Sequence, residues 1–175
     1  MQSRFFESHR EALEKAVEAI GRRGYWSLYP EMPSGKIYGE TANDDGKRAF
    51  ESRLNTHFDI DQPGTVGKVG SEVSPFGMKL GITYPKIDAN VLLPAMIKAS
   101  EAWGRASCDD RAGVCMEILS RLNKRSFEIA YAVHHTTGQP FMMAFQAGGP
   151  HAQDRGLEAI AYAYAEMKRV PASAS

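Results

Sequence analysis

Residues 107–140, SCDDRAGVCMEILSRLNKRSFEIAYAVHHTTGQP, carry a long helical pattern. Ser107 followed by Asp110 resembles a capping box in which Asp replaces Glu, and this pair predicts where the helix begins. Apolar residues then recur at helical spacing as far as Val133, and Gly138 ends the pattern. We therefore predict one long helix between Ser107 and Gly138.

An amphipathic helix is also predicted near the start of the chain, from Ser3 to about Arg23. Its apolar side repeats every three or four residues, as Phe6, His9, Leu13, Val17 and Ile20. Gly24 is well placed as the left-handed residue that ends this helix. A second helix is predicted from near Thr41 to about His57.

Two further helices are predicted in the second half of the chain. One begins near Asn90, capped by Asp88 or Asn90 itself, because Pro94 belongs in the first turn of a helix. Its apolar stripe is Val91, Leu92, Ala95, Met96, Ala99, Ala102 and Trp103. The last helix starts at Pro150, which suits the first helical position, and stops at Pro171.

The periodicity changes between the helix predicted to end near His57 and the helix predicted to begin near Asn90. Residues 64–85 combine glycines with Val, Leu, Ile and Tyr, which is typical of short strands and tight turns. Ser74-Pro75-Phe76-Gly77 places Pro and Gly at turn positions and predicts a hairpin. The chain is therefore expected to be mainly α-helical, with a short β-ribbon around residues 65–85.

An aromatic, turn-rich connector follows the first helix. Its sequence, from Tyr25 to Gly35, is YWSLYPEMPSG, and the prolines and glycine argue against a regular element. Tyr25, Trp26 and Tyr29 place three aromatic residues within five positions, which is unusual for a flexible linker. We expect them to pack on the preceding helix or on a partner surface.

Composition narrows the class of protein. A chain of 175 residues with 43% hydrophobic and 24% charged residues fits one soluble globular domain. Because 21 Lys and Arg balance 21 Asp and Glu, no electrostatic case exists for a nucleic acid or an anionic membrane as partner. No stretch is apolar enough for a membrane span, and two cysteines fit a reducing compartment, so we expect a cytoplasmic protein.

His134 and His135, with His151 further on, are the first candidates for chemistry. Adjacent residues on a helix point about 100° apart, so His134 and His135 cannot easily bind one metal ion. We favour the interpretation that one of them is buried or caps the end of the helix. A small metalloprotein that uses all three histidines stays open as an alternative.

Cys108 and Cys115 are the second candidates. Seven residues on a helix span about 10 Å, which is too far for a disulfide between them. Cys108 lies near a predicted helix N-terminus, which would lower its pKa, but no histidine with an orienting acid is recognisable beside it. Cys115 lies in an apolar stripe with Val114 and Ile118 and is interpreted as a core residue.

Glycine-rich phosphate loops are the third candidate. The glycines of the ribbon, Gly67, Gly70, Gly77 and Gly81, do not form the spacing of a dinucleotide-binding turn. Gly148-Gly149 precedes a helix whose N-terminus could hold an anion, but a corner between two helices is the favoured interpretation. On residue chemistry alone, no catalytic, cofactor-binding or metal-binding residue is assigned.

Several segments together resemble the start of the aldehyde dehydrogenase superfamily core. Residues 99–103 match the tryptophan helix of the family, residues 110–114 the start of the next helix, and residues 119–122 with Arg125 its middle. Thr136-Thr137-Gly138-Gln139-Pro140 stands where the family usually has a sequence of the Glu-Thr-Gly-Lys-Pro type.

Two stretches narrow the resemblance to the phenylacetic acid degradation (PaaN) type within this superfamily. They are residues 23–27 with 29–34, and residues 145–156, FQAGGPHAQDRG. The resemblance implies an α/β enzyme in which residues 1–60 are an N-terminal helical extension. Residues 61–175 would then be the ribbon and helices that start the NAD(P)-binding domain.

The resemblance also implies a reaction. The family oxidises aldehydes with NAD or NADP, using a cysteine nucleophile, a glutamate that activates water and an asparagine that stabilises the oxyanion. The implied substrate is a semialdehyde carried as a CoA thioester. In the family these residues and the glycine-rich cofactor turn lie beyond the segment that this chain matches. No catalytic residue, bound cofactor or turnover is therefore expected for this chain alone.

The resemblance implies the remainder of the enzyme as a partner, and a homo-oligomer, with no nucleic acid or membrane involved. The alternative from the residues themselves is a self-contained helical binding or assembly module. Such a module would use the aromatic segment from Tyr25 to Tyr29.

Overall fold

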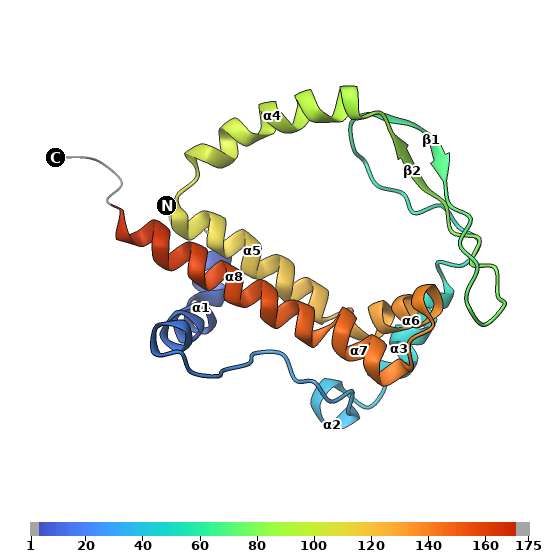
Figure 1. The fold of residues 1–175 in the computed structure, drawn as a ribbon, viewed down its shortest axis with the longest axis horizontal. Coiled ribbons are helices and arrows are strands. Elements are labelled where there is room, and N and C mark those ends of the chain that lie inside the picture. The colour runs from blue at the N-terminus through green and yellow to red at the C-terminus, as the bar shows by residue number, and fades with distance from the viewer. Residues whose placement is uncertain (1–3, 171–175) are drawn as a thin grey trace. The chain divides into compact units, whose positions relative to one another are not determined.

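The computed structural model describes residues 4–170, and its helices and strands are shown in Figure 1. The helices are α1 (Arg4–Arg22), α2 (Gly35–Tyr38), α3 (Ala42–Glu51), α4 (Ala89–Arg105), α5 (Cys108–Asn123), α6 (Ser126–Thr137), α7 (Phe141–Gly148) and α8 (Pro150–Arg169). The strands β1 (Thr65–Val69) and β2 (Tyr84–Ile87) pair antiparallel. The predicted combination of many helices with one short ribbon is confirmed. The predicted ends at Ser3 and Pro171 lie outside the described residues.

The chain folds into two compact units, and each is discontinuous in sequence. The first contains residues 4–32, 106–126 and 146–170, and the second contains residues 33–105 and 127–145. None of the borders between the two units falls at the predicted boundary between residues 60 and 61. The assignment of an extension and a cofactor-binding domain to the two sides of that boundary stays a prediction, because compact units and family domains are different divisions of a chain.

The first unit is built from α1, α5 and α8, which pack on one another around a shared apolar core (Figure 1). The buried members of this core are Phe6, Leu13, Ala16, Tyr29, Ala112, Met116, Leu119, Leu157 and Ala161. Helices α1 and α5 approach closely at Gly113, where a Cβ atom would lie 2.5 Å from the backbone nitrogen of Phe6. The core of the unit therefore depends on a backbone contact between two helices as well as on apolar burial.

The first helix ends one residue earlier than predicted. Arg23, and not Gly24, takes the left-handed conformation, with φ 53°. The N–H of Gly24 donates to the carbonyl of Ala19 at 2.9 Å and that of Arg23 to Ile20 at 3.2 Å, which is the Schellman arrangement. This motif needs a left-handed residue directly after the helix, and Gly24 stands one position too late for that role.

The predicted long helix from Ser107 to Gly138 is wrong, because the structure divides it into α5 and α6. Gln153 of α8 holds the break from both sides. The side-chain amide of Asn123 donates to Gln153 at 2.9 Å, and the amide of Gln153 donates to the hydroxyl of Ser126 at 3.2 Å. Since Gln153 and Ser126 are both buried, these hydrogen bonds satisfy polar groups that would otherwise destabilise the core.

The second unit contains two apolar clusters. One joins Phe50, Leu80 and Ile82, and the other joins Phe127, Ala130 and Phe145. The predicted helix from Thr41 to His57 ends earlier, at Glu51, because Asn55 takes a positive φ of 58° and its N–H donates to the carbonyl of Leu80 at 2.9 Å.

The short helix α2 was not predicted, and it begins at Gly35, the last residue of the stretch for which no regular element was expected. Its N-cap is Ser34, whose hydroxyl accepts a hydrogen bond from the N–H of Lys36 at 3.3 Å. The prolines before it stop at residue 33, so the sequence signal against regular structure did not extend into this helix.

The ribbon of the second unit turns where the sequence predicted. The N–H of Gly77 donates to the carbonyl of Ser74 at 2.8 Å, and Val73 pairs with Lys79 across the turn. Between β1 and β2 the register shifts by a bulge between Thr65 and Gly67. The predicted hairpin at residues 74–77 is confirmed.

Helix α4 begins close to the predicted position. The carboxylate of Asp88 accepts from the N–H of Asn90 at 2.9 Å, so Asp88 is the capping residue. Pro94, however, lies in the second turn of the helix and not in the first. The N–H that Pro94 lacks would have bonded to the carbonyl of Asn90, and Asn90 is exposed, so water can satisfy that carbonyl. No described helix has the length and apolar character needed to cross a membrane.

Candidate functional site

The aromatic segment after α1 divides into anchoring and exposed residues. Tyr29 is buried in the core of the first unit, and Trp26 packs against the same core. Tyr25 is 84% exposed. The expectation that aromatic residues of this segment pack on their own chain is confirmed for Trp26 and Tyr29. Tyr25 is the member of the three that is presented to solvent.

Asp154 of α8 holds this segment in place. Its carboxylate accepts a hydrogen bond from the hydroxyl of Ser27 at 2.6 Å and from the N–H of Leu28 at 3.3 Å. His151, one turn earlier on α8, lies 3.2 Å from the carboxylate of Glu31. The two stretches that carried the narrower resemblance, residues 23–34 and 145–156, are therefore bonded to each other.

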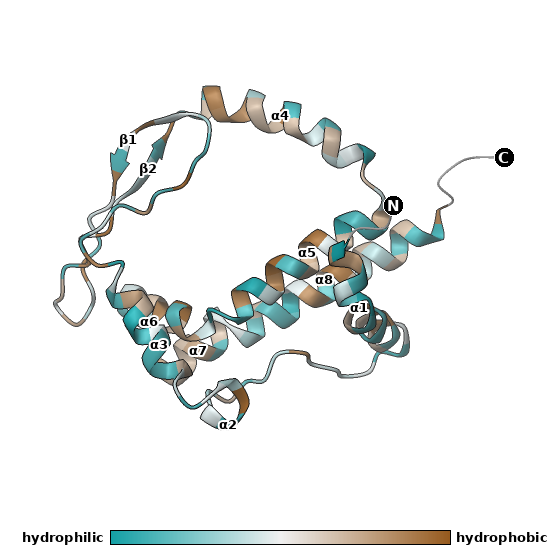
Figure 2. Cartoon of the chain, turned by 180° about the vertical axis from the view of Figure 1, so that it is seen from behind, coloured by the Kyte–Doolittle hydropathy of each residue, from teal (hydrophilic) through white to brown (hydrophobic). Residues whose placement is uncertain are grey.

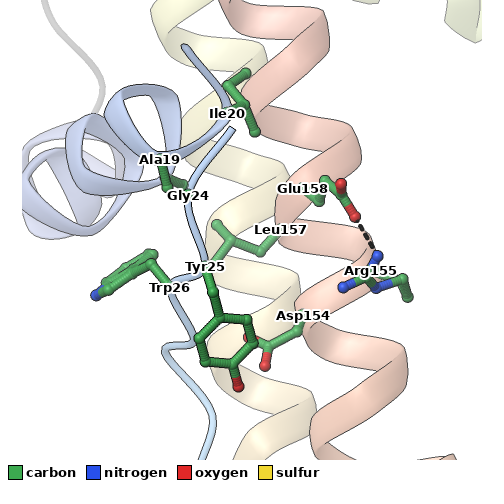
Figure 3. A pocket seen from close by; sticks show the side chains of 10 residues that line it. Ala19, Ile20, Gly24, Tyr25, Trp26, Asp154, Arg155, Leu157 and Glu158 are labelled. Atoms are coloured by element: carbon green, nitrogen blue, oxygen red, sulfur yellow. Dashed lines mark ion pairs between the residues drawn. The ribbon is translucent and has the colours of Figure 1, made fainter. Parts of the chain in front are cut away.

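A pocket of about 90 Å³ lies where the aromatic segment passes between α1 and α8 (Figure 3). Its apolar wall comes from Ile20, Tyr25 and Trp26. On α8, Arg155 and Glu158 form an ion pair of 2.6 Å beside it. Pockets for small molecules usually hold about 300–1,000 Å³, so this one has room for a side chain and not for a dinucleotide.

The pKa of Tyr29 gives a test of this arrangement. Burial, reinforced by the carboxylate of Asp154, raises the pKa of Tyr29 from 10 to about 12. Between those values the unfolded chain loses the phenol proton while the folded chain keeps it, so the free energy of unfolding should fall as pH rises. We expect Asp154→Asn to lower the pKa of Tyr29 in a spectrophotometric titration. Tyr29→Phe should remove part of the alkaline loss of stability, and an unchanged alkaline profile would contradict the assignment.

The histidine pair of α6 is occupied by packing contacts within the second unit. His134 lies 2.6 Å from the carbonyl of Gln139 through Nδ1 and stacks on Phe76. His135 stacks on Phe50 at 5.1 Å between ring centres, and its Nδ1 lies 3.1 Å from the hydroxyl of Ser74. Among residues 4–170, no group of three His, Cys, Asp or Glu side chains is arranged to hold a metal ion. That this chain binds no metal stays a prediction.

The environment of His135 makes the second unit sensitive to acid. Burial, and then the charge of His134, lowers the pKa of His135 from its ordinary value of 6.5. Below pH 6.5 the unfolded chain takes up a proton that the folded chain resists, so stability contributed by neutral His135 is lost as pH falls. We expect the urea midpoint to drop as pH falls below about 6.5. His135→Gln should flatten that drop, and an unchanged acid profile in this variant would contradict the assignment.

The two cysteines are free and half-buried. Cys108 is the first residue of α5, and the guanidinium of Arg111 lies 3.8 Å from its sulfur. The predicted cap is confirmed, because the N–H of Asp110 donates to the hydroxyl of Ser107 at 3.0 Å. The neighbours of Cys108 supply a cation but no base, so nothing in its surroundings assigns it as a nucleophile.

The helix junctions of the described chain do not fit a nicotinamide dinucleotide. At the start of α8, Pro150 is fully buried and has no N–H to offer a phosphate, and Gly149 before it is buried too. In the described residues, β2 is the strand that leads into a helix, and the junction to α4 is made by Asp88. A carboxylate there repels phosphate, where a dinucleotide site needs glycines.

Two α8 residues that hold parts of the first unit together were not predicted from the sequence. Gln153 holds the α5–α6 break, and Asp154 anchors the aromatic segment. Both lie within residues 145–156, which were singled out for their resemblance and not for any chemical role. A polar residue on the core-facing side of a helix indicates a buried hydrogen bond. Its partner, however, cannot be predicted from the neighbouring sequence.

Similarity to known proteins indicates the superfamily that shares this fold. No family model matches the chain, and no curated protein matches it significantly. A crystal structure of an NAD-dependent aldehyde dehydrogenase from Burkholderia multivorans superposes with a TM-score of 0.95 and 53% sequence identity over 99% of this chain. The chain is homologous to a segment of an aldehyde dehydrogenase. This similarity supports the assignment to the aldehyde dehydrogenase superfamily. It also shows that the described residues have an aldehyde dehydrogenase-like fold.

The match covers 31% of that aldehyde dehydrogenase, so the chain spans about a third of its length. Because the match is partial, the phenylacetate type, the substrate and the assembly of the whole enzyme are proposals. The family-level expectation from residues 99–140 is confirmed by this comparison at the level of the superfamily.

Proposed function

We propose that this chain is a helical segment of an NAD-dependent aldehyde dehydrogenase that oxidises a semialdehyde, carried as a CoA thioester, in phenylacetate degradation. The observation that carries the proposal is 53% identity over nearly the whole chain to an aldehyde dehydrogenase named for NAD. NAD would accept the hydride when bound to the complete enzyme, which we place in the cytoplasm as a homo-oligomer.

The narrower part of the proposal rests on the segment anchored by Asp154. Residues 23–34 and 145–156 resemble the phenylacetic acid degradation type, and Ser27 and Asp154 bond one to the other. A resemblance in two stretches that form one structural feature carries more weight than the same resemblance in two separate loops.

We propose that this chain has a structural role in the enzyme and supplies no group that reacts. The helix junctions at the starts of α4 and α8 do not fit the cofactor, and neither cysteine has the surroundings of a nucleophile. Asp154 fixes the aromatic segment, and α1, α5 and α8 form the packed body that carries it. We propose that the cofactor and the reacting groups are supplied by the part of an aldehyde dehydrogenase that lies outside the matched segment.

The proposal is tested by activity in two settings. The 175-residue chain, given NAD and an aliphatic semialdehyde as the free acid or the CoA thioester, is expected to form no NADH. Placed in the Burkholderia enzyme in exchange for the matched segment, the same chain should support aldehyde-dependent NADH formation. Turnover by the chain alone, or a folded chimaera that oxidises no aldehyde, would overturn the proposal.

A binding module is the second candidate, favoured by the exposure of Tyr25 beside the pocket on α8. The same chimaera separates the two, because a pure binding module confers no aldehyde oxidation. If that candidate holds, Tyr25→Ala should leave the fold unchanged, since the ring makes little contact with the core.

A further inference from the structure

The turn at residues 74–77 is held to the end of α6 by two of its side chains. The hydroxyl of Ser74 lies 3.1 Å from Nδ1 of His135, and the ring of Phe76 stacks on His134 at 4.6 Å between ring centres. Figure 2 shows the loop between β1 and β2 in which this turn lies, and apolar and polar residues follow one another along it. Because both contacts are made to histidines, the charge of the last turn of α6 decides how firmly the turn is held.

Backbone hydrogen bonds anchor the chain after this turn to a different segment. The N–H of Asn55 donates to the carbonyl of Leu80 at 2.9 Å, and the N–H of Thr83 donates to the carbonyl of Thr56 at 3.0 Å. Backbone amides do not titrate, so these anchors are independent of pH. Residues 73–79 are joined to each other by the short ladder across the turn, and an isolated two-stranded hairpin is marginally stable in water. The turn therefore depends on its contacts with the two histidines.

The bond between Ser74 and His135 requires a neutral imidazole. Ser74 is 2% exposed, and its hydroxyl oxygen accepts a hydrogen bond from the N–H of Phe76 at 3.2 Å. The hydroxyl hydrogen can then donate to Nδ1 of His135, which accepts it when that nitrogen carries no proton. Protonation turns Nδ1 into a donor and leaves the buried hydroxyl hydrogen without its acceptor. Because an unsatisfied buried donor is destabilising, a proton on His135 weakens the hold on the turn.

His134 responds to a proton in the opposite way. Its Nδ1 lies 2.6 Å from the carbonyl of Gln139, to which it donates in either charge state. An imidazolium over the ring of Phe76 would be attracted to that ring. The two imidazole rings lie 5.0 Å apart between centres, so a charge on His134 opposes a charge on His135. His135 is therefore the group whose proton releases the turn, and His134 influences the pH at which this happens.

The other titratable groups on the elements around His135 include several that are paired with one another. They are the pairs Lys47–Glu51, Asp45–Arg48 and Arg53–Glu128, with Asp44 of α3, Tyr131 of α6, and His57, Glu72, Lys79 and Tyr84 of the ribbon and the segment beside it. Burial, and then the charge of His134, lowers the pKa of His135. Burial and a like charge both disfavour the imidazolium while the turn is closed.

We propose that residues 73–79 form a strap that lies on the last turn of α6 when His135 is neutral and lifts when His135 is protonated. An open strap exposes His135 to solvent, where its pKa moves towards the ordinary value of 6.5. Opening therefore takes up a proton, and the open fraction should rise as pH falls below about 6.5, by at most about tenfold per pH unit. The strap belongs to the second unit alone and does not depend on the proposed function.

Amide exchange of the 175-residue chain, measured by NMR as protection factors, tests the strap. These factors correct for the dependence of intrinsic exchange on pH. Between about pH 7.5 and about pH 5, above the range in which exposed carboxylates titrate, the amides of Ser74 and Gly77 should lose protection. The amides of Phe58 and Thr83, which bond to backbone carbonyls, should keep theirs. No loss at the turn, or an equal loss at all four amides, overturns the proposal.

His135→Asn is the decisive variant, because its side-chain oxygen can stand where Nδ1 stood and does not titrate. Its turn should stay protected at both pH values, and a drop as large as that of the parent chain would refute the role of His135. His134→Asn is the matched control. It removes the neighbouring charge, so the drop should persist and move to higher pH. An abolished drop in His134→Asn would assign the response to His134 and overturn the proposal.

Circular dichroism at neutral pH shows whether each variant is folded. If His135→Asn fails to fold, Ser74→Ala takes its place, because it removes the hydroxyl whose hydrogen loses its acceptor. Ser74→Ala should reduce protection of the turn already at neutral pH and flatten its dependence on pH. An unchanged dependence on pH in that variant would contradict the proposal.

Discussion

We expect Gly113→Ala to lower the free energy of unfolding of the first unit by about 3 kcal/mol. A Cβ atom at Gly113 would lie 2.5 Å from the nitrogen of Phe6 and 2.8 Å from its Cα. These are backbone atoms of α1, so the clash cannot be relieved by rotating a side chain. The helices must separate, and the core between them loses packing.

The control for this substitution is Gly21→Ala in α1. A Cβ at Gly21 meets nothing within 4 Å, so the substitution should stabilise the chain by about 0.5–1 kcal/mol through helix propensity. Urea denaturation followed by circular dichroism measures both variants. If Gly113→Ala proved as harmless as Gly21→Ala, the close crossing of α1 and α5 would be refuted.

Phe145→Ala is expected to cost about 4 kcal/mol in the second unit. Phe145 is fully buried, and its ring lies 4.8 Å from that of Phe127 and 5.5 Å, edge to face, from that of Tyr38. Truncation would remove the apolar burial and also both aromatic contacts, which leaves a cavity among rings that cannot collapse freely.

Met143→Ala is the control in the same helix. Met143 is 55% exposed, so its loss should change stability by no more than about 0.5 kcal/mol. Thermal melts that place the two α7 variants together would show that Phe145 is not part of a close-packed core. Helix propensity contributes less than about 0.7 kcal/mol to this comparison, because ordinary residues differ from alanine by no more than that.

The sequence predicted those features that are local in origin. The N-cap at Ser107, the cap at Asp88 and the turn at residues 74–77 each depend on residues a few positions apart, and each is confirmed. It also indicated the superfamily, which the Burkholderia structure supports. Only part of the candidate site could be predicted from the sequence. The aromatic segment stood out by its composition, whereas its anchor, Asp154, did not.

The errors arose where a distant residue decides a local conformation. The apolar pattern from residue 107 to 138 is continuous, and it does not predict the break between α5 and α6. Gln153 of α8 stabilises that break through its hydrogen bonds. The same holds for the early end of α3, since Asn55 is turned toward Leu80 by a hydrogen bond across 25 positions of sequence.

By itself, the sequence determined the helical character, the ribbon, most caps and the family resemblance, because propensity, capping and periodicity act over one or two turns of chain. The tertiary structure decided where the helices break, which of the aromatic residues are buried and that α4 has no buried side chain. Those outcomes depend on which surfaces meet, and pairings between distant surfaces are set by the packing of the whole unit and not by any single stretch.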